Sequence, residues 1–280
     1  MKINIYSSVI LIFGLLFLTC TKTPFGDDDI YSGARQISGT VELYDGANAE
    51  NVYVWLEGFS IGTYTDENGN FSLTLPSKSS SGNSAGVSGN FSLYFYVANY
   101  TLKSALVMIR ENEFVYSRGD INKDGKLSAP MVLKRFLRIQ TDVSPASVPA
   151  SHTDPINVNV SLTATDSATV ILPKSMGGML GAILIKSIDS PGGQSYESVP
   201  YLMTKAKLLV GSYSKTVSMS FTLIYKPLNS GKYEVVPFIL MAHEEIPEAL
   251  IASITNDIEQ FNSNYLNIPF VRQGGAFEVR

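Results

Sequence analysis

The residues with the clearest chemical potential form a run of alternating oxygen-bearing side chains, Asp120-Ile121-Asn122-Lys123-Asp124-Gly125. Such side chains at alternate positions, followed by glycine, can wrap a hard cation such as calcium. The twelfth position of a calcium loop should hold a bidentate glutamate, but Met131 stands there, after Pro130. Asp, Asn and Gly are also ordinary turn residues. We therefore expect a hairpin turn, with Asp120, Asn122 and Asp124 kept as candidate calcium ligands.

Catalytic side chains show no comparable pattern. The two histidines, His152 and His243, lie far apart along the sequence, and neither belongs to a zinc motif. The chain has one cysteine, Cys20, so a zinc site would need both histidines together with carboxylates. The sequence therefore predicts no catalytic residues and a protein that is not an enzyme.

Composition limits the class of protein and of partner. The chain has 280 residues, of which 45% are hydrophobic and 16% charged, and its formal net charge is −4. This length and apolar content predict two domains. Few charges and many polar and aromatic residues are typical of exported β proteins. The negative charge argues against nucleic acid, which requires clustered Lys and Arg.

The elements that would position any site begin after an N-terminal leader. Lys2 precedes an apolar run from Val9 to Leu18, which is too short to span a membrane. Its end, Phe17-Leu18-Thr19-Cys20, resembles a bacterial lipobox, in which signal peptidase II cleaves before a lipidated cysteine. We therefore expect a signal peptide over 1–19 and lipidation of Cys20, the alternative being ordinary secretion.

The residues after the cysteine suggest where the protein resides. Thr21, rather than Asp, follows Cys20, which by resemblance to lipoprotein sorting implies the outer membrane. Asp27-Asp28-Asp29 resembles an acidic signal that directs lipoproteins to the cell surface. A solvated linker is an equally good interpretation of these residues. Residues 20–34 lack periodicity and are predicted to be a tether.

Alternating apolar residues predict strands from residue 35 onward. Asp66, Asn68 and Gly69 supply turn chemistry within Thr65–Pro76, and Phe71, Leu73 and Leu75 then share one face of a strand, so we expect a half-buried strand that leaves a tight hairpin. With the two preceding strands, this stretch resembles the carboxypeptidase regulatory-like family, which implies a transthyretin-like β-sandwich over about 35–140. The matching residues are Gly39, Val41, Val52, Val54, Thr65, Asp66, Gly69 and Phe71.

Three aromatic residues are the candidate ligand site of this first domain. Tyr53 and Trp55, the only tryptophan, share one face of the strand Asn51–Glu57, and Tyr64 follows on the next strand. Sandwiches related to the family include starch-binding modules, which stack sugars on exposed aromatic rings. The alternative is that these rings pack against the second sheet or the neighbouring domain, which we favour because sandwich strands often bury both faces.

The second half of the chain predicts another β domain. A Pro-bearing stretch, 144–155, is the expected linker, and strands are expected at 156–164, 169–172, 181–188, 215–225 and 233–242. This spacing favours an immunoglobulin-like sandwich. Pro247 begins a predicted helix that caps an open sandwich end. Its apolar stripe comprises Leu250, Ile251, Ile254, Ile258 and Phe261.

The sequence as a whole thus predicts an all-β protein of two antiparallel sandwiches with one short C-terminal helix. The expected domains span 35–143 and 156–280. The expected function is a non-enzymatic cell-envelope lipoprotein acting as a structural or interaction module, which meets the membrane through its anchor and binds an envelope protein or glycan. A carbohydrate-binding surface lipoprotein is the alternative, and an accessory to a hydrolase is a third.

Overall fold

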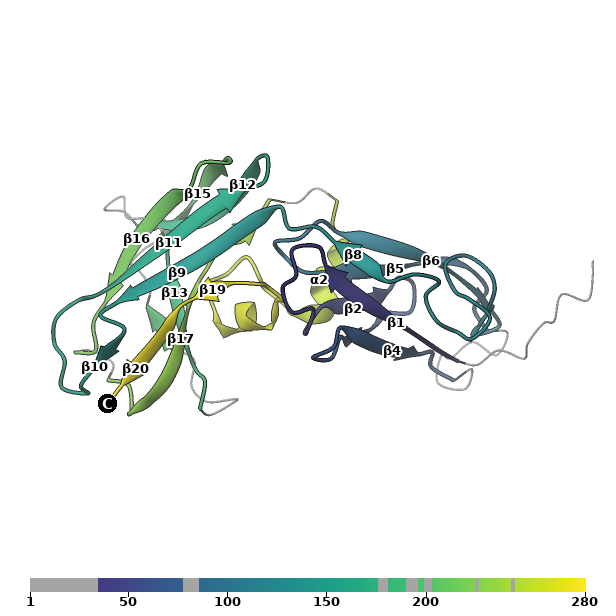
Figure 1. Ribbon diagram of the computed structural model, residues 1–280, viewed down its shortest axis with the longest axis horizontal. Coiled ribbons are helices and arrows are strands. Elements are labelled where there is room, and N and C mark those ends of the chain that lie inside the picture. The colour runs from purple at the N-terminus through teal and green to yellow at the C-terminus, as the bar shows by residue number, and fades with distance from the viewer. Residues whose placement is uncertain are drawn as a thin grey trace, which may run out of the picture.

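Most of the alternating stretches form β-strands in the computed structural model, which describes residues 35–77, 86–175, 181–189, 196–198, 203–224, 227–242 and 245–280 (Figure 1). The strands make two sandwich-like bodies that lie one after the other along the longest axis of the molecule. The prediction of an all-β, sandwich-like fold is confirmed. Within the described ranges, no helix has the length and apolar character needed to cross a membrane.

The first sandwich packs a three-stranded sheet against a five-stranded sheet. The smaller sheet has the order β4-β1-β8, with β1 at Gln36–Leu43, β4 at Asn70–Thr74 and β8 at Met131–Leu133. The larger sheet has the order β3-β2-β5-β6-β7, with bounds Ile61–Tyr64, Tyr53–Leu56, Gly89–Tyr96, Lys103–Arg110 and Glu113–Phe114. Apolar side chains from alternate positions of both sheets meet in one buried cluster.

The turn at Asp66–Gly69 forms as its residues predict. The Asp66 carboxylate accepts the backbone N–H groups of Asn68 and Asn70, both at 2.9 Å, and Gly69 adopts φ +76°. The expectation of a simple hairpin is corrected, however, because β4 pairs with β1 and not with the preceding β3. The turn therefore carries the chain from one sheet of the sandwich to the other.

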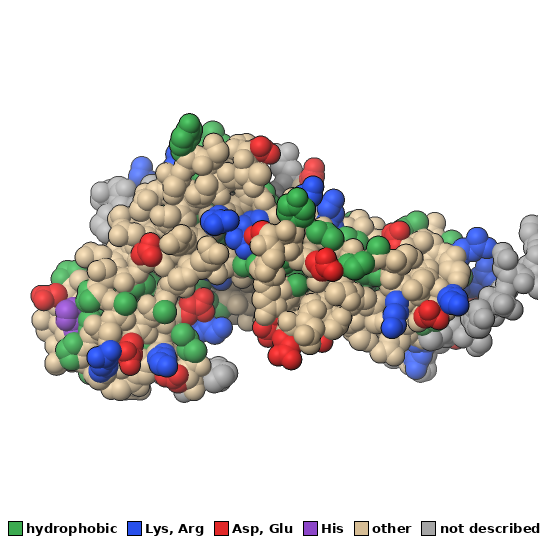
Figure 2. Space-filling view, in the orientation of Figure 1, with side chains coloured by type: hydrophobic (Ala, Val, Ile, Leu, Met, Phe, Trp, Pro, Cys, Tyr) green, Lys and Arg blue, Asp and Glu red, His purple; other side chains and the backbone are tan. Residues whose placement is uncertain are grey.

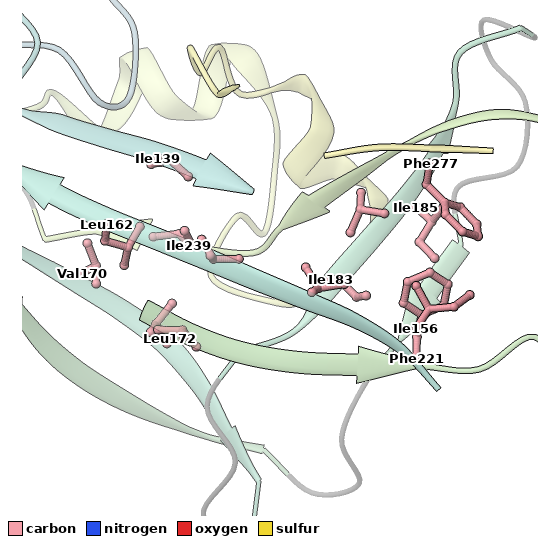
Figure 3. Packing of buried hydrophobic residues seen from close by; sticks show 14 of the residues in the cluster. Ile139, Ile156, Leu162, Val170, Leu172, Ile183, Ile185, Phe221, Ile239 and Phe277 are labelled. Carbon is pink, nitrogen blue, oxygen red and sulfur yellow. The ribbon is translucent and has the colours of Figure 1, made fainter. Parts of the chain in front are cut away.

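The second sandwich consists of three sheets around one core (Figure 3). One sheet has the order β16-β11-β9-β19, with bounds Lys215–Phe221, Ile156–Ala164, Leu137–Ser144 and Gln273–Gly274. Another has the order β10-β20-β17-β13-β14, with bounds Ser147–Val148, Ala276–Val279, Gly231–Pro237, Ile183–Ser187 and Tyr196–Ser198. The third, β15-β12-β18, comprises Met203–Val210, Ala168–Ser175 and Leu240–Met241. Ile156, Phe221 and Phe277 come together at one end of this core.

The chain passes between the sandwiches earlier than predicted. The apolar run over 131–139, which alternates like a single strand, forms two strands, because β8 pairs with β1 of the first sandwich and β9 pairs with β11 of the second. The crossing therefore lies at 134–136, and the predicted linker 144–155 lies inside the second sandwich. Leu133, Leu137 and Ile139 are all buried. The apolar pattern therefore continues through the crossing, and the sequence gives no sign that the chain leaves one sandwich and enters the other.

The sequence predicts purely antiparallel sheets, but the structure also contains parallel strand pairs. Three strand pairs are parallel, namely β1 with β8, β10 with β20, and β9 with β19. In each pair the later strand returns beside a much earlier one, and a sequence pattern does not report such long-range pairing.

The predicted C-terminal helix is present but shorter and differently placed. Helix α2 spans Glu248–Ile254, and Thr255 is already extended, so Ile258 and Phe261 lie beyond it. A 3₁₀ turn follows at Ser263–Asn267. Instead of capping an open end, this C-terminal segment, residues 245–272, packs where the two sandwiches meet (Figure 1). The segment packs there because the first sandwich has an apolar outer face, which includes Tyr53 and Trp55, and burying that face against the segment removes it from water.

Candidate functional groove

A large groove lies between the C-terminal segment and both sandwiches. It has a volume of about 940 Å³. Tyr96 and Ala98 contribute from the first sandwich, Ile171 and Leu240 from the second, and Ile251 from helix α2. Ligand sites commonly form at such domain interfaces. We refer to this hollow as the junction groove.

The inner side of the junction groove is built from aromatic rings that hydrogen bonds and ring contacts hold in place. Tyr265 is fully buried there, and its hydroxyl accepts the N–H of Ile239 at 3.1 Å and donates to the carbonyl of Ile239 at 2.9 Å. Phe238 packs on the Tyr265 ring with 4.6 Å between ring centroids. The Arg272 guanidinium lies 4.2 Å from the centroid of Phe270, a cation–π contact. These contacts fix one wall of the groove to the second sandwich.

The rim of the junction groove carries the charged residues. Lys205 and Glu259 form an ion pair with 2.6 Å between Nζ and Oε2, and this bond lowers the pKa of the Glu259 carboxyl. Glu248 and Asp257 also line the groove, and neither has an ion-pair partner among the residues that the structure describes. The rim therefore has an excess of negative charge.

A second hollow of about 300 Å³ adjoins the first. Both hollows are lined by Ile171, Leu240, Lys205 and Glu259, and the smaller one adds the ring of Phe261. The Lys205–Glu259 pair thus stands where the two hollows meet. The two hollows therefore share part of their apolar and charged lining.

The predicted aromatic platform is not exposed. Trp55 is 2% exposed and Tyr53 is 5% exposed, and both rings belong to the buried cluster that includes Leu250 and Tyr265 of the C-terminal segment. The Tyr53 hydroxyl lies 3.0 Å from the Ser253 hydroxyl, within hydrogen-bond distance. The sugar-stacking interpretation of these two rings is therefore wrong, and the alternative, packing against the neighbouring part of the chain, is what the structure shows.

Tyr64 is the exposed member of the predicted trio. It is 43% exposed, and its ring centroid lies 4.9 Å from that of Tyr53. Partial burial and the neighbouring Tyr53 raise the pKa of its hydroxyl. Strand β2 is buried on both faces, so the structure leaves Tyr64 without Tyr53 and Trp55 as exposed partners for a sugar ring.

The candidate calcium ligands are used by a turn. The Asp120 carboxylate accepts the Leu106 N–H at 2.6 Å. The Asn122 side-chain oxygen accepts the N–H groups of Asp124 and Lys126 at 2.9 and 3.0 Å. The predicted hairpin turn is thus present. In the described ranges, no group of three or more His, Cys, Asp or Glu side chains is placed to hold a metal ion.

The remaining candidates fall in different places. Cys20 and His243 lie outside the described residues. His152 lies in the connection between β10 and β11, within the second sandwich. No sequence motif marks the junction groove, because its walls come from segments far apart along the chain. The one local signal was the concentration of Tyr265 and Phe270 just after the predicted helix.

The fold and groove define an all-β protein of two joined sandwiches, and comparison with known proteins adds little to that description. No family model and no curated protein matches the chain. Among solved structures, the chain is similar to "The Bacillus anthracis TIE protein", with 12% identity and a TM-score of 0.23. That similarity covers 75% of this chain and 28% of the other chain, so the chain spans little more than a quarter of its length. A TM-score of this size carries no argument about fold or function.

Proposed function

We propose that this protein is a non-enzymatic, lipid-anchored protein of the cell envelope, and that its two sandwiches act as one rigid interaction module. The observation that carries the proposal is the hydrogen-bonded and packed junction between the sandwiches. A hinged pair of domains would present two independent surfaces, whereas a fixed pair presents one composite surface to a partner.

Asn99 is the centre of the junction. Its side chain is fully buried in the first sandwich, and its amide donates to the carbonyls of Leu137 and Val271 at 3.0 and 2.9 Å. Its side-chain oxygen accepts the Val271 N–H at 3.1 Å. One residue thereby links the start of β9, the C-terminal segment and the first sandwich.

An ion pair also stabilises residues 134–136, where the chain passes from the first sandwich to the second. The Arg135 Nε lies 2.8 Å from the Asp45 carboxylate, with 9% and 25% of the two side chains exposed. Arg135 also donates to the Tyr100 hydroxyl at 2.8 Å, and that hydroxyl donates to Asp45 at 3.0 Å. Burial raises the pKa of Tyr100 to about 12, so the hydroxyl stays protonated and able to donate at neutral pH.

The position of the chain ends supports an anchored module. Strand β1 begins at the end of the first sandwich that is remote from the second, and the C-terminus lies at the opposite end of the molecule (Figure 1). A tether over 20–34 with a lipid on Cys20 would join that remote end to the membrane. The second sandwich and the junction groove would then stand away from the membrane surface.

The surface supports a protein partner in the envelope. Acidic and basic side chains are interspersed over the face in Figure 2, without a basic field of the kind that nucleic acid requires. Burial of Tyr53 and Trp55 removes the platform on which the glycan alternative rested. We therefore favour an envelope protein over a glycan as the partner, at the outer membrane.

We also propose that the first sandwich belongs to the carboxypeptidase regulatory-like family. Val41, Val52, Val54 and Phe71, which carry the resemblance, are all buried in one core, and Gly69 occupies a turn position with positive φ. These residues support a shared fold. They supply no peptidase chemistry.

Radiolabelled palmitate tests the anchor directly. We expect wild-type protein in its native host to be labelled and to sediment with membranes, and Cys20→Ala to lose both properties. The matched control is Thr21→Ser, which keeps the cysteine and should be labelled like wild type. Equal labelling of wild type and Cys20→Ala would refute lipidation. Digestion of intact cells with protease would then report surface exposure.

A further inference from the structure

We propose that the junction groove binds a small amphiphile, a molecule with an apolar chain and a positively charged head group. This inference concerns the described residues alone and does not depend on the lipid anchor. It rests on the volume and apolar base of the groove, and on the sign of the charge along its rim.

The size and lining of the groove suit a small apolar molecule. Small-molecule sites usually have volumes of roughly 300–1,000 Å³ and mostly apolar walls. The groove lies in this range at about 940 Å³, and Ile171, Ile251, Ile258 and Phe270 line it while only partly buried. An apolar chain placed there would remove these side chains from water, which is the main favourable term in such binding. Because the walls come from both sandwiches and from the C-terminal segment, the hollow is concave, unlike the flatter surface that protein partners use.

The charge of the rim selects the head group. Lys205 is neutralised by Glu259 at 2.6 Å, which leaves Glu248 and Asp257 as carboxylates with no cationic partner among the described residues. A positive head group at the mouth would face two negative charges, whereas a carboxylate or phosphate head group would be repelled by them. The occupant is therefore a cationic amphiphile and not a fatty acid.

The experiment compares three probes that share a ten-carbon chain. These are decyltrimethylammonium, neutral decyl maltoside and decanoate, each titrated below its micelle-forming concentration into the chain from residue 21 onward, which contains every described residue. Calorimetry measures affinity. Fluorescence of Trp55, the only tryptophan, gives a second signal, because its ring belongs to the same cluster as Tyr96, Leu240 and Ile268 of the groove. We expect one decyltrimethylammonium per chain, bound at least about tenfold more tightly than decanoate.

Two variants separate the apolar and the charged contributions. Ala252 is exposed and lines the groove, so Ala252→Phe should fill it and weaken binding of decyltrimethylammonium by about tenfold or more, with an unchanged melting temperature. The double variant Glu248→Gln/Asp257→Asn should weaken that binding about threefold to tenfold and leave decyl maltoside unaffected. The control Glu67→Gln/Asp154→Asn removes the same charge from exposed positions outside the groove lining and should behave as wild type.

Three results would overturn the proposal. Binding of decanoate as tight as that of decyltrimethylammonium would refute the charge argument. Binding that Ala252→Phe leaves unchanged would place the amphiphile elsewhere. No binding of any of the three probes to the folded wild-type chain would exclude an amphiphile site and leave the groove to another kind of partner. Palmitate labelling of Cys20 is independent of all three results, so the two proposals fail separately.

Discussion

Gly69 shows how a single residue fixes the connection between the two sheets of the first sandwich. It adopts φ +76°, and a Cβ at this position would collide with the Val41 carbonyl oxygen. The Gly69 carbonyl in turn accepts the Val41 N–H at 2.8 Å, at the point where β4 begins to pair with β1. Both the conformation and the close approach therefore require glycine here.

We expect Gly69→Ala to lower the free energy of unfolding by about 2–3 kcal/mol, because strain from positive φ and the steric collision add together. Gly46→Ala is the matched control. Gly46 has φ +73°, but nothing lies within 4 Å of an added Cβ, so it should cost only the backbone term of about 1 kcal/mol. Urea unfolding of both variants measures the difference. If both variants lose the same free energy of unfolding, the collision between the added Cβ and the Val41 carbonyl oxygen is relieved by a small shift that costs no stability.

Strands and turns were predictable because their determinants are local, whereas their pairing was not. Alternation places Val54 and Leu56 on one face of β2, and the turn chemistry of Asp66 needs only its neighbours. The same alternation gave no sign that β8 and β9 belong to different sandwiches, since both strands bury alternate residues. Sequence periodicity thus reports which face is buried and not what covers it.

Helix α2 illustrates the same limit. Its apolar stripe was visible in the sequence, but Leu250 is buried in a cluster that combines residues of both sandwiches, and no sequence pattern showed that the helix would pack there. The helix has seven residues and lacks a side-chain N-cap bond, so packing must supply most of its stability.

Leu250→Ala should therefore lower the free energy of unfolding by about 2–4 kcal/mol, the usual cost of a cavity left by a buried leucine. Ile188→Ala is the control, since Ile188 is 52% exposed and should change the free energy by about 0.5 kcal/mol or less. Chemical denaturation with matched baselines checks both. A loss at Leu250 as small as that at Ile188 would show that the helix does not contribute to the shared core.

The junction joins the two sandwiches through contacts that no single segment contains. The cluster that covers strand β2 combines Trp55 and Tyr96 with Phe238 and Tyr265, which are separated by more than a hundred residues. The junction groove lies at the edge of this cluster, and its walls likewise come from segments that are far apart along the chain. A site of this kind follows from tertiary packing, and a single sequence reveals only the aromatic residues that build it.

The two sandwiches should consequently unfold as one unit, and Asn99 is the residue that tests this expectation. We expect one calorimetric transition for the wild-type protein. In Asn99→Ala, the Val271 N–H and the carbonyls of Leu137 and Val271 lose their buried partner, which should cost about 3 kcal/mol and split the transition in two. The control Asn157→Ala removes an exposed amide on β11 and should keep the single transition. Two transitions already present in the wild type would mean that the sandwiches are hinged, and the rigid interaction module would then have to be abandoned.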